Sequence, residues 1–251
     1  MSVKSDLSVD YLARQKSEHG AKQWQGPRAV QMTGDANPNS IGAHIRDTLR
    51  GFGSEVVSYK GDIRKCENNA HFNPLLDALI CCHGVMNLNW FENASGRKVR
   101  EIFDVNLYGS YMVAQEFVRA TINSPKRKKI IFTGSMAYTK VLNGSAAYCA
   151  SKAGLAMLTR CLAWELAPKG YDVYCIHPSN VEDAPMSEET IQGLMAYRGL
   201  TRTVAERYWS DTVLRDHQLT KDEITFMVKT LLRAEAGYLS GSNIELAGGA
   251  R

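Results

Sequence analysis

Short apolar runs alternate with longer helix-like segments along most of this chain. Apolar runs bounded by glycine, proline or polar residues predict strands at 28–34, 55–59, 75–84, 129–135, 171–178 and 243–247. Apolar residues at helical spacing predict helices at 40–53, 96–122 and 146–167, and a helical, irregular region continues to about residue 236. Strands that alternate with helices form a parallel sheet covered on both faces, so the predicted fold class is α/β.

The connection between the second and third strands is unusually short. About 15 residues separate Tyr59 from the strand that begins near Leu75. A crossover to a parallel strand needs a dozen or more residues, so this interval has room for one crossover but not for helix, strand and helix. We therefore expect six parallel strands, with the strand that ends at Tyr59 at the sheet edge and no strand between Lys60 and Phe72.

Composition and charge exclude several classes of protein. The 251 residues are 44% hydrophobic and 22% charged with a formal net charge of +4, as in an ordinary soluble globular protein. No run reaches 18 apolar residues, so we expect no membrane span. The basic cluster at 126–129 lacks interleaved aromatic residues, so we expect no nucleic-acid partner. Residues 1–27 form a polar extension without a secretory signal, and 28–251 form one domain.

The cysteines and histidines suggest no metal site. Six cysteines show no spacing typical of metal ligands, and most of them lie in apolar runs where a thiol behaves as a small buried hydrophobe. The six histidines are scattered along the chain. This usage predicts a reducing, cytoplasmic compartment.

A glycine-containing loop follows the first strand. The stretch TGDANPNSIGAHI (33–45) joins a predicted strand to a predicted helix, the context that a dinucleotide-binding loop requires. Its spacing is not G-x-G-x-x-G, so a plain strand-to-helix turn remains an alternative. Gly34, Cys82, Gly84, Ser135 and Pro178 all fall at the carboxyl ends of predicted strands, where ligands bind in parallel sheets.

A serine, a tyrosine and a lysine form a candidate proton-transfer set. Ser135 ends the strand at FTGS, and Tyr148 and Lys152 follow 13 and 17 residues later on a predicted helix. Residues four apart lie on the same helix face, so Tyr148 and Lys152 point the same way. A nearby ammonium favours the phenolate, and a serine hydroxyl can hydrogen-bond a substrate oxygen. The alternative is a chance pairing on an alanine-rich helix.

These motifs together resemble the short-chain dehydrogenase/reductase family. The resemblance covers about residues 28–251, in the order of the family, through TGDANPNSIG, CCHG, DVNLYG, FTGSMA, AAYCASKAG, LAWELAPKGYDVYCIHPS and YLSGSNIELAGGAR. It implies a Rossmann-type, doubly wound domain that uses a nicotinamide cofactor. It also implies that Tyr148 is the catalytic acid/base, that Lys152 holds the nicotinamide ribose and lowers the Tyr148 pKa, that Ser135 orients the substrate and that Asn106 anchors a relay water.

The resemblance also implies a set of cofactor-binding residues: Gly34, Ser40, Ile41, Gly42, Lys60, Asp62, Ile63, Cys82, Gly84, Tyr148, Lys152, Pro178, Ser179 and Val181. Lys60 stands where an acid would select NAD, and a cation there attracts the ribose phosphate of NADP. We therefore expect NADP(H) in preference to NAD(H), although Asn39 occupies a position where many NADP-using relatives carry Arg or Lys.

Several departures from the family keep other functions open. The loop is two residues longer than usual and has Ser40 for a glycine, as in the enoyl-reductase branch, but that branch places Lys six residues after Tyr, where this chain has Gly154. CCHG replaces NNAG, with His83 interpreted as a packing residue, and PSNVED places Asp183 where Thr is usual. The leading hypothesis is oxidoreduction of a carbonyl or secondary alcohol. The alternatives are an enoyl-thioester reductase and a cofactor-binding regulator without turnover.

The resemblance finally implies a substrate lid and an oligomer. The lid spans about 183–223 and contains Met186, Met195, Tyr197, Tyr208 and Trp209, so a partly apolar substrate fits. The two long helices that carry Asn106 and Tyr148 pack against a symmetry mate in the family, which implies a homodimer or homotetramer.

Overall fold

The sheet at the centre of the molecule has six parallel strands. The computed structural model describes residues 26–66, 72–210, 215 and 217–249, so most of the predicted extension 1–27 lies outside the described residues. The strands are β1 (Ala29–Thr33), β2 (Glu55–Ser58), β3 (Ala78–Cys81), β4 (Lys128–Thr133), β5 (Tyr171–Pro178) and β6 (Asn243–Leu246). They lie in the order β2-β1-β3-β4-β5-β6, and each neighbouring pair is parallel. The prediction of six strands is confirmed.

β2 lies at one edge of this sheet, as the short connection after it predicted. It pairs with β1, where Val56 lies opposite Val30. After β2 the described chain contains a short 3-10 turn at Ile63–Lys65, and residues 67–71 lie outside the described residues. Within the described part of the chain no strand follows β2 on its outer side. The chain then returns to β3 on the other side of β1, so the strand order reverses between β1 and β3, the place where ligands bind in such sheets.

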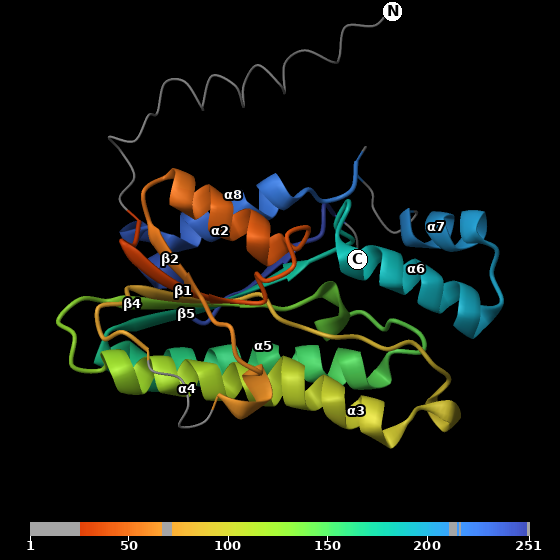
Figure 1. The fold of residues 1–251 in the computed structure, drawn as a ribbon, viewed down its shortest axis with the longest axis horizontal. Coiled ribbons are helices and arrows are strands. Elements are labelled where there is room, and N and C mark those ends of the chain that lie inside the picture. Colours follow the sequence, from red (N-terminus) through yellow and green to blue (C-terminus); the bar gives the residue numbers. More distant parts are fainter. Residues whose placement is uncertain (1–25, 67–71, 211–214, 216, 250–251) are drawn as a thin grey trace, which may run out of the picture.

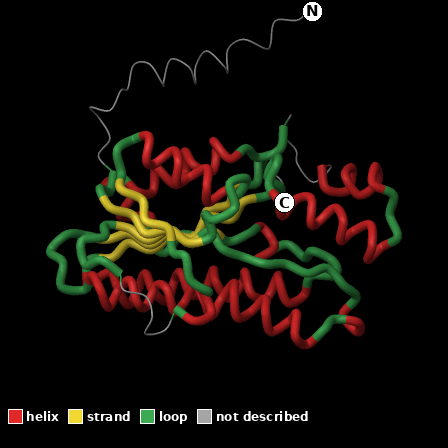
Figure 2. Tube along the Cα trace, viewed as in Figure 1, coloured by secondary structure: helices red, strands yellow, loops and turns green. Residues whose placement is uncertain are grey.

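Helices cover both faces of the sheet (Figures 1 and 2). One face carries α2 (Ile41–Gly51) and α8 (Lys221–Leu232), and the other carries α3 (Gly96–Phe103), α4 (Ser110–Thr121) and α5 (Ala146–Leu166). Successive strand residues therefore enter different cores: Ile130 packs with Phe117 and Leu155, whereas Ile131 packs with Ile45. Burial on both faces explains why the strands are continuous apolar runs in the sequence.

The long helix predicted at 96–122 is continuous but not uniform. Between α3 and α4 the residues Asp104–Gly109 form a π-helical turn, which contains the buried Asn106. A π turn is a local irregularity that is often found at functional sites, and sequence periodicity does not reveal it. The predicted strand at 75–84 is shortened to Ala78–Cys81, because Cys82–Gly84 leave the sheet toward the region beyond its carboxyl end.

The predicted lid contains two helices and lies beyond the carboxyl end of the sheet. These helices, α6 (Pro185–Arg198) and α7 (Arg202–Ser210), extend from the main body of the molecule in Figure 1. The segment before α6 is joined to the segment before α8 by a parallel bridge between Val181 and Leu219. None of the helices in the described residues combines the length and apolar character needed to cross a membrane.

Candidate active site

The glycine-containing loop is packed too closely to tolerate side chains at two positions. Gly34 has a φ of +74°, and a Cβ there would lie 2.3 Å from the backbone nitrogen of His83. A Cβ on Gly42 would lie 2.6 Å from the carbonyl oxygen of Gly34. Glycine is required at both positions, because the loop is pressed against the end of β3 and the first turn of α2. Neither glycine has a side chain that would cover the backbone of the loop.

Ser40 begins α2 as its N-cap. Its hydroxyl accepts a hydrogen bond from the backbone nitrogen of Ala43 (3.0 Å) and donates one to the carbonyl oxygen of Gly34 (3.3 Å). The first turn of α2 carries no acidic side chain. Because a helix N-terminus attracts anions, this loop and helix fit the diphosphate of a dinucleotide.

Asp35 joins the loop to the edge strand. Its side chain is fully buried, accepts a hydrogen bond from the Ser58 hydroxyl of β2 and lies 3.6 Å from the Arg46 guanidinium. Its other carboxylate oxygen, Oδ1, has no hydrogen-bond partner among the described residues. Arg46 offsets the negative charge of Asp35 at the end of the sheet where the adenosine of a dinucleotide would lie.

Asn106, Gly84 and Lys152 come together next to this loop. Asn106 accepts a hydrogen bond from the Val85 nitrogen (2.8 Å), and its amide donates to the Val85 oxygen (2.9 Å) and the Ser151 hydroxyl (3.0 Å). A Cβ on Gly84 would lie 3.4 Å from Lys152 Nζ and 3.5 Å from Asn106 Oδ1. The π turn therefore holds the loop after β3 beside Lys152. Because Gly84 has no side chain, space remains next to Lys152 Nζ and Asn106 Oδ1.

Lys152 is a buried cation on α5. Its ammonium donates a hydrogen bond to the carbonyl oxygen of Thr133 (2.9 Å) at the end of β4, and it lies 5.7 Å from the centre of the Tyr148 ring. Burial lowers the pKa of Lys152 to about 8. The helical spacing of four residues thus places the tyrosine and the lysine on one face, as the sequence predicted.

Tyr148 is 5% exposed and lies between Ser135 and the lid. Burial raises its pKa to about 12, while the hydrogen bond with Ser135 acts in the opposite direction. The phenol is therefore protonated near neutral pH in the chain alone. Its hydroxyl donates to the thioether sulfur of Met186 on α6 at 3.8 Å. The lowering of this pKa by Lys152, which the resemblance implies, stays a prediction.

A buried histidine that the sequence analysis did not single out supports Ser135. His177 of β5 lies with Nδ1 3.0 Å from the carbonyl oxygen of Ser135, and its Nε2 lies 2.9 Å from Asn243 Oδ1. Its ring stacks on Tyr138 at 3.7 Å between centroids. A Cβ on Gly134 would lie 2.4 Å from His177 Nδ1, so the backbone before Ser135 lies directly against the ring.

His83 is a structural residue in this arrangement. Its Nδ1 lies 2.6 Å from the Thr33 hydroxyl and its Nε2 lies 3.0 Å from the Ser110 hydroxyl, so both ring nitrogens have partners. Burial lowers the pKa of His83 to about 3, and the neighbouring Lys152 cation acts in the same direction. The neutral ring joins β1, β3 and α4, which supports its interpretation as a packing residue. Its neighbour Cys82 has a pKa raised by burial to about 11.

Other predicted cofactor residues lie on the segments that follow β2 and β5. Lys60 is exposed just after β2, and Asp62 forms an ion pair with Arg64 (2.8 Å) that lowers the Asp62 pKa to about 2. Ile63 is buried, 3.0 Å from where a Cβ on Gly109 would lie. Ser179 donates its backbone N–H to the Leu246 oxygen of β6 (3.1 Å).

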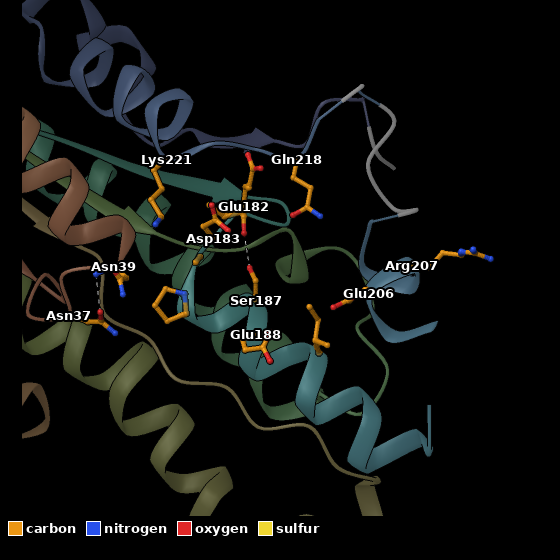
Figure 3. A pocket seen from close by; sticks show the side chains of 14 residues that line it. Asn37, Asn39, Glu182, Asp183, Ser187, Glu188, Glu206, Arg207, Gln218 and Lys221 are labelled. Carbon is orange, nitrogen blue, oxygen red and sulfur yellow. Dashed lines mark hydrogen bonds between the residues drawn. The ribbon is translucent and has the colours of Figure 1, made fainter. Parts of the chain in front are cut away.

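A cavity of about 870 Å³ separates the glycine-containing loop from the lid (Figure 3). The loop contributes Asn37 and Asn39, and the segment after β5 contributes Val181 and Asp183, whose φ is +52°. The charged side chains that line it are Glu182, Asp183, Glu188, Glu206, Arg207 and Lys221. In Figure 3 the Lys221 side chain points toward the space between Asp183 and Asn39, whereas Arg207 points away. No sequence motif indicated Lys221, because α8 reaches this cavity only through the fold.

The glycine-containing loop and the Ser135–Tyr148–Lys152 cluster lie in a chain that is similar to known proteins. Residues 67–251 match the family model described as Enoyl-(Acyl carrier protein) reductase. Over 244 residues the chain is 31% identical to (+)-borneol dehydrogenase 1 of Salvia officinalis, a similarity that covers 89% of this chain and 88% of that protein.

Solved structures share the fold at lower identity. A variant of actinorhodin polyketide ketoreductase with NADPH has a TM-score of 0.77 at 19% identity and covers 89% of this chain and 97% of its own. NAD⁺-bound xylitol dehydrogenase has a TM-score of 0.77 at 20% identity and covers 91% of this chain and 100% of its own. Given the family match, the plant relative and the common fold, the chain belongs to the short-chain dehydrogenase/reductase family of nicotinamide-dependent oxidoreductases.

Proposed function

We propose that the chain transfers hydride between a nicotinamide cofactor, preferentially NADP(H), and a carbonyl or secondary alcohol substrate, with Tyr148 as the acid/base. The observation that carries this proposal is the buried Tyr148 hydroxyl, whose pKa is raised by burial and lowered by Ser135, and which shares its helix face with the Lys152 ammonium. A protein that merely bound the cofactor would have no physical need for a serine and a buried ammonium around one phenol. The alternative of a regulator without turnover is therefore disfavoured.

In the direction of carbonyl reduction, Tyr148 donates its proton to the carbonyl oxygen. Its pKa of about 12 keeps the hydroxyl protonated near neutral pH, and the Ser135 hydroxyl hydrogen-bonds the same oxygen and orients it. Lys152 stabilises the phenolate that is left, because its ammonium lies on the same face of α5. The bound nicotinamide would supply or accept the hydride. In the oxidation of an alcohol the phenolate accepts the proton.

The residues that surround the site fit a dinucleotide. Three glycines keep the site free of side chains. Added Cβ atoms on Gly34 and Gly42 would collide with backbone atoms, and a Cβ on Gly84 would approach Lys152 and Asn106. The N-terminus of α2 would hold the diphosphate, and the Lys221 ammonium, which points toward the same cavity, would add a positive charge. Lys152 would hydrogen-bond the nicotinamide ribose.

Lys60 supports the preference for NADP(H). It is exposed at the carboxyl end of the edge strand β2, where the adenosine ribose lies in folds of this class. A lysine there attracts a ribose phosphate as a point charge. Asp35, the carboxylate beneath the loop, opposes this attraction, but Arg46 lies 3.6 Å from it and offsets its charge.

Enoyl-thioester reduction is the second candidate, since the matched family model carries that description. The enoyl branch would need a lysine at position 154. A Cβ on Gly154 would lie 2.9 Å from the Leu107 side chain, so that position faces the π turn between α3 and α4. Lys152 is the cation near Tyr148 instead.

One assay separates these functions. Purified protein with NADPH or NADH is mixed with a panel of ketones, and in parallel with crotonyl-coenzyme A, while cofactor absorbance is followed. The proposal expects consumption of NADPH with at least one ketone and none with the enoyl thioester. Consumption with crotonyl-coenzyme A alone would contradict it in favour of enoyl reduction. Cofactor binding with no turnover of any compound would favour the regulator.

We also propose that the chain forms a homo-oligomer. Exposed apolar side chains lie on α5, where Met157 is 54% and Trp164 is 86% exposed, and Tyr111 is exposed on the adjoining α4. These faces suit burial against a second copy. Light scattering after size exclusion would give a dimer or tetramer mass if this is correct and a monomer mass if it is wrong.

We further propose a cytoplasmic location. All six cysteines are free thiols, as a reducing compartment would keep them.

A further inference from the structure

The lid meets the catalytic hydroxyl through one side chain. Met186 lies in the first turn of α6, and its sulfur accepts the hydrogen bond of Tyr148 at 3.8 Å. The sulfur therefore occupies a position that a substrate oxygen must take if Tyr148 is to give it a proton. Methionine has three rotatable bonds, so it can leave this position while the helix stays in place.

The other walls around Tyr148 are apolar. Ile102 of α3, Ala137 after β4 and Tyr148 form one buried cluster. Packed against this cluster are Val85, Met86, Ala147, Cys149 and Met186. The groups that flank the reacting carbon of a substrate would therefore lie against hydrocarbon and sulfur, which cannot solvate a charge.

A second cavity adjoins these walls. It has a volume of about 250 Å³ and shares Val85, Met86 and Ile102 with the apolar cluster. Its charged residues are Lys98, Glu101 and Glu189, so its lining carries one positive and two negative groups. The ammonium of Lys98 is paired with Glu101 at 2.9 Å. The Lys98 ammonium is thus already paired, and Glu189 of the lid adds a second carboxylate to the lining.

The larger cavity carries further carboxylates. Glu182 and Asp183 line it, and so does Glu188, whose charge is already paired with Arg202 of α7 at 2.9 Å. Arg97 and Arg100 of α3 do not line the smaller cavity. An anionic substrate would therefore meet carboxylates at the lid and an already paired lysine at the wall.

From these observations we infer the substrate class. The substrate is an uncharged ketone or secondary alcohol flanked by hydrocarbon, which lies in the cavity formed by Gly84–Asn87, Ile102 and Glu189, and whose oxygen displaces the Met186 sulfur from Tyr148. Phosphorylated, carboxylated and coenzyme-linked carbonyl compounds are poor substrates. This inference rests on the proposed function and specifies the substrate of the same site.

The test compares two alcohols that differ in charge. The full-length protein with saturating NADP⁺ receives 4-methylcyclohexanol or 4-hydroxycyclohexane-1-carboxylate at equal concentration, and the melting temperature is measured. The inference expects the neutral alcohol to raise the melting temperature more. An equal or larger rise with the carboxylate, or no rise with either alcohol, would overturn it. Absence of NADPH formation while the neutral alcohol still stabilises the protein would instead count against the proposed function.

A charge-reversal variant makes the test independent of the choice of ring. Glu189→Lys reverses the charge balance of the smaller cavity, because the introduced ammonium and Lys98 would then face the Glu101 carboxylate alone. The ratio of neutral to carboxylate binding constants should fall by about tenfold, the size of one charge interaction in a partly desolvated site. Glu55→Lys at the exposed amino end of β2 is the matched control and should leave the ratio unchanged. An unchanged ratio in Glu189→Lys would contradict the inference.

Discussion

The sulfur of Met186 lies 3.8 Å from the hydroxyl oxygen of Tyr148 and accepts its hydrogen bond. One residue comes from the lid helix α6 and the other from α5, which packs beneath the sheet. Tyr148 is 5% exposed, and this contact covers its hydroxyl in the chain alone. With Tyr148 as the proposed acid/base, substrate binding exchanges this weak sulfur acceptor for a carbonyl or hydroxyl oxygen, and the proposal gives the side chain at position 186 control of the space for that exchange.

Shortening Met186 should therefore change the size of the substrate that is accepted. In Met186→Ala the ratio of kcat/KM for 2-adamantanone to that for cyclohexanone should rise by about tenfold, because one apolar wall recedes. Met186→Leu keeps the volume and should leave the ratio near that of the unaltered protein. Steady-state kinetics with NADPH measure both ratios. Equal ratios in the two variants would show that position 186 does not bound the substrate.

The pH dependence should differ between the two directions of the reaction. Tyr148 has a pKa of about 12 and Lys152 of about 8, both set mainly by burial. Reduction needs the protonated phenol and the lysine cation, so its kcat/KM should be flat up to pH 8 and fall above it. Alcohol oxidation needs the phenolate and the cation, so its kcat/KM should rise up to pH 8 and then level off. Initial rates at constant ionic strength measure both profiles, and a reduction rate that increases with pH would contradict these roles.

The strand pattern predicted most of the fold, and the motif spacing predicted that Tyr148 and Lys152 lie close together. Six strands, the edge position of β2 and the shared face of Tyr148 and Lys152 follow from local sequence, because alternation of elements and four-residue spacing are local properties. That no described residue forms a strand outside β2 was expected from the chain length between Tyr59 and Leu75, which limits what a crossover can contain.

Contacts between distant segments could not be predicted in the same way. The stacking of His177 on Tyr138 and the position of Lys221 at the cavity depend on how β5 and α8 pack, and no local pattern encodes either. The π turn around Asn106 was also missed, since its 6 residues are too few to show a periodicity of their own. The methionine at position 186 was expected in the lid, but its contact with Tyr148 required the tertiary structure.

His83 should make the protein sensitive to acid. Its pKa is lowered to about 3 in the folded chain, below the value near 6.5 of an unfolded histidine. Folding is then favoured fully above pH 6.5, and the free energy of unfolding should decrease as the pH falls from 6.5 toward 3. His83→Gln keeps hydrogen-bonding groups for Thr33 and Ser110 without a titrating ring, so its stability should depend less steeply on pH. Urea unfolding at several pH values measures the slopes.

An unchanged slope in His83→Gln would refute this role of the ring. His44→Gln is the matched control, because His44 is partly exposed at the surface and contacts Asp222 (3.0 Å) rather than the site.

Cofactor choice should depend on Lys60. Calorimetric titration should show tighter binding of NADPH than of NADH, and Lys60→Ala should reduce that difference by about tenfold, as expected for one charge-assisted contact with the ribose phosphate. Lys221→Ala is the control variant, since Lys221 points toward the space between Asp183 and Asn39, beside the loop proposed to hold the diphosphate, and its loss should weaken both cofactors alike. Tighter binding of NADH, with a ratio unaffected by Lys60→Ala, would refute the preference and direct attention to the buried carboxylate of Asp35.

The role of Tyr148 is tested most directly by removal of its hydroxyl. Tyr148→Phe should lower kcat by about 10²–10⁴ on a substrate established for the unaltered protein, while NADPH still binds, because acid-base catalysis is lost and the ring remains. Tyr171→Phe is the matched control: it removes another buried hydroxyl, bonded to Thr121 at 2.8 Å in the core, and should lower stability without a comparable loss of turnover. Stopped-flow and steady-state rates with both variants give the measurement. A large loss confined to Tyr148→Phe is the predicted result, and near-normal turnover in that variant would contradict the account.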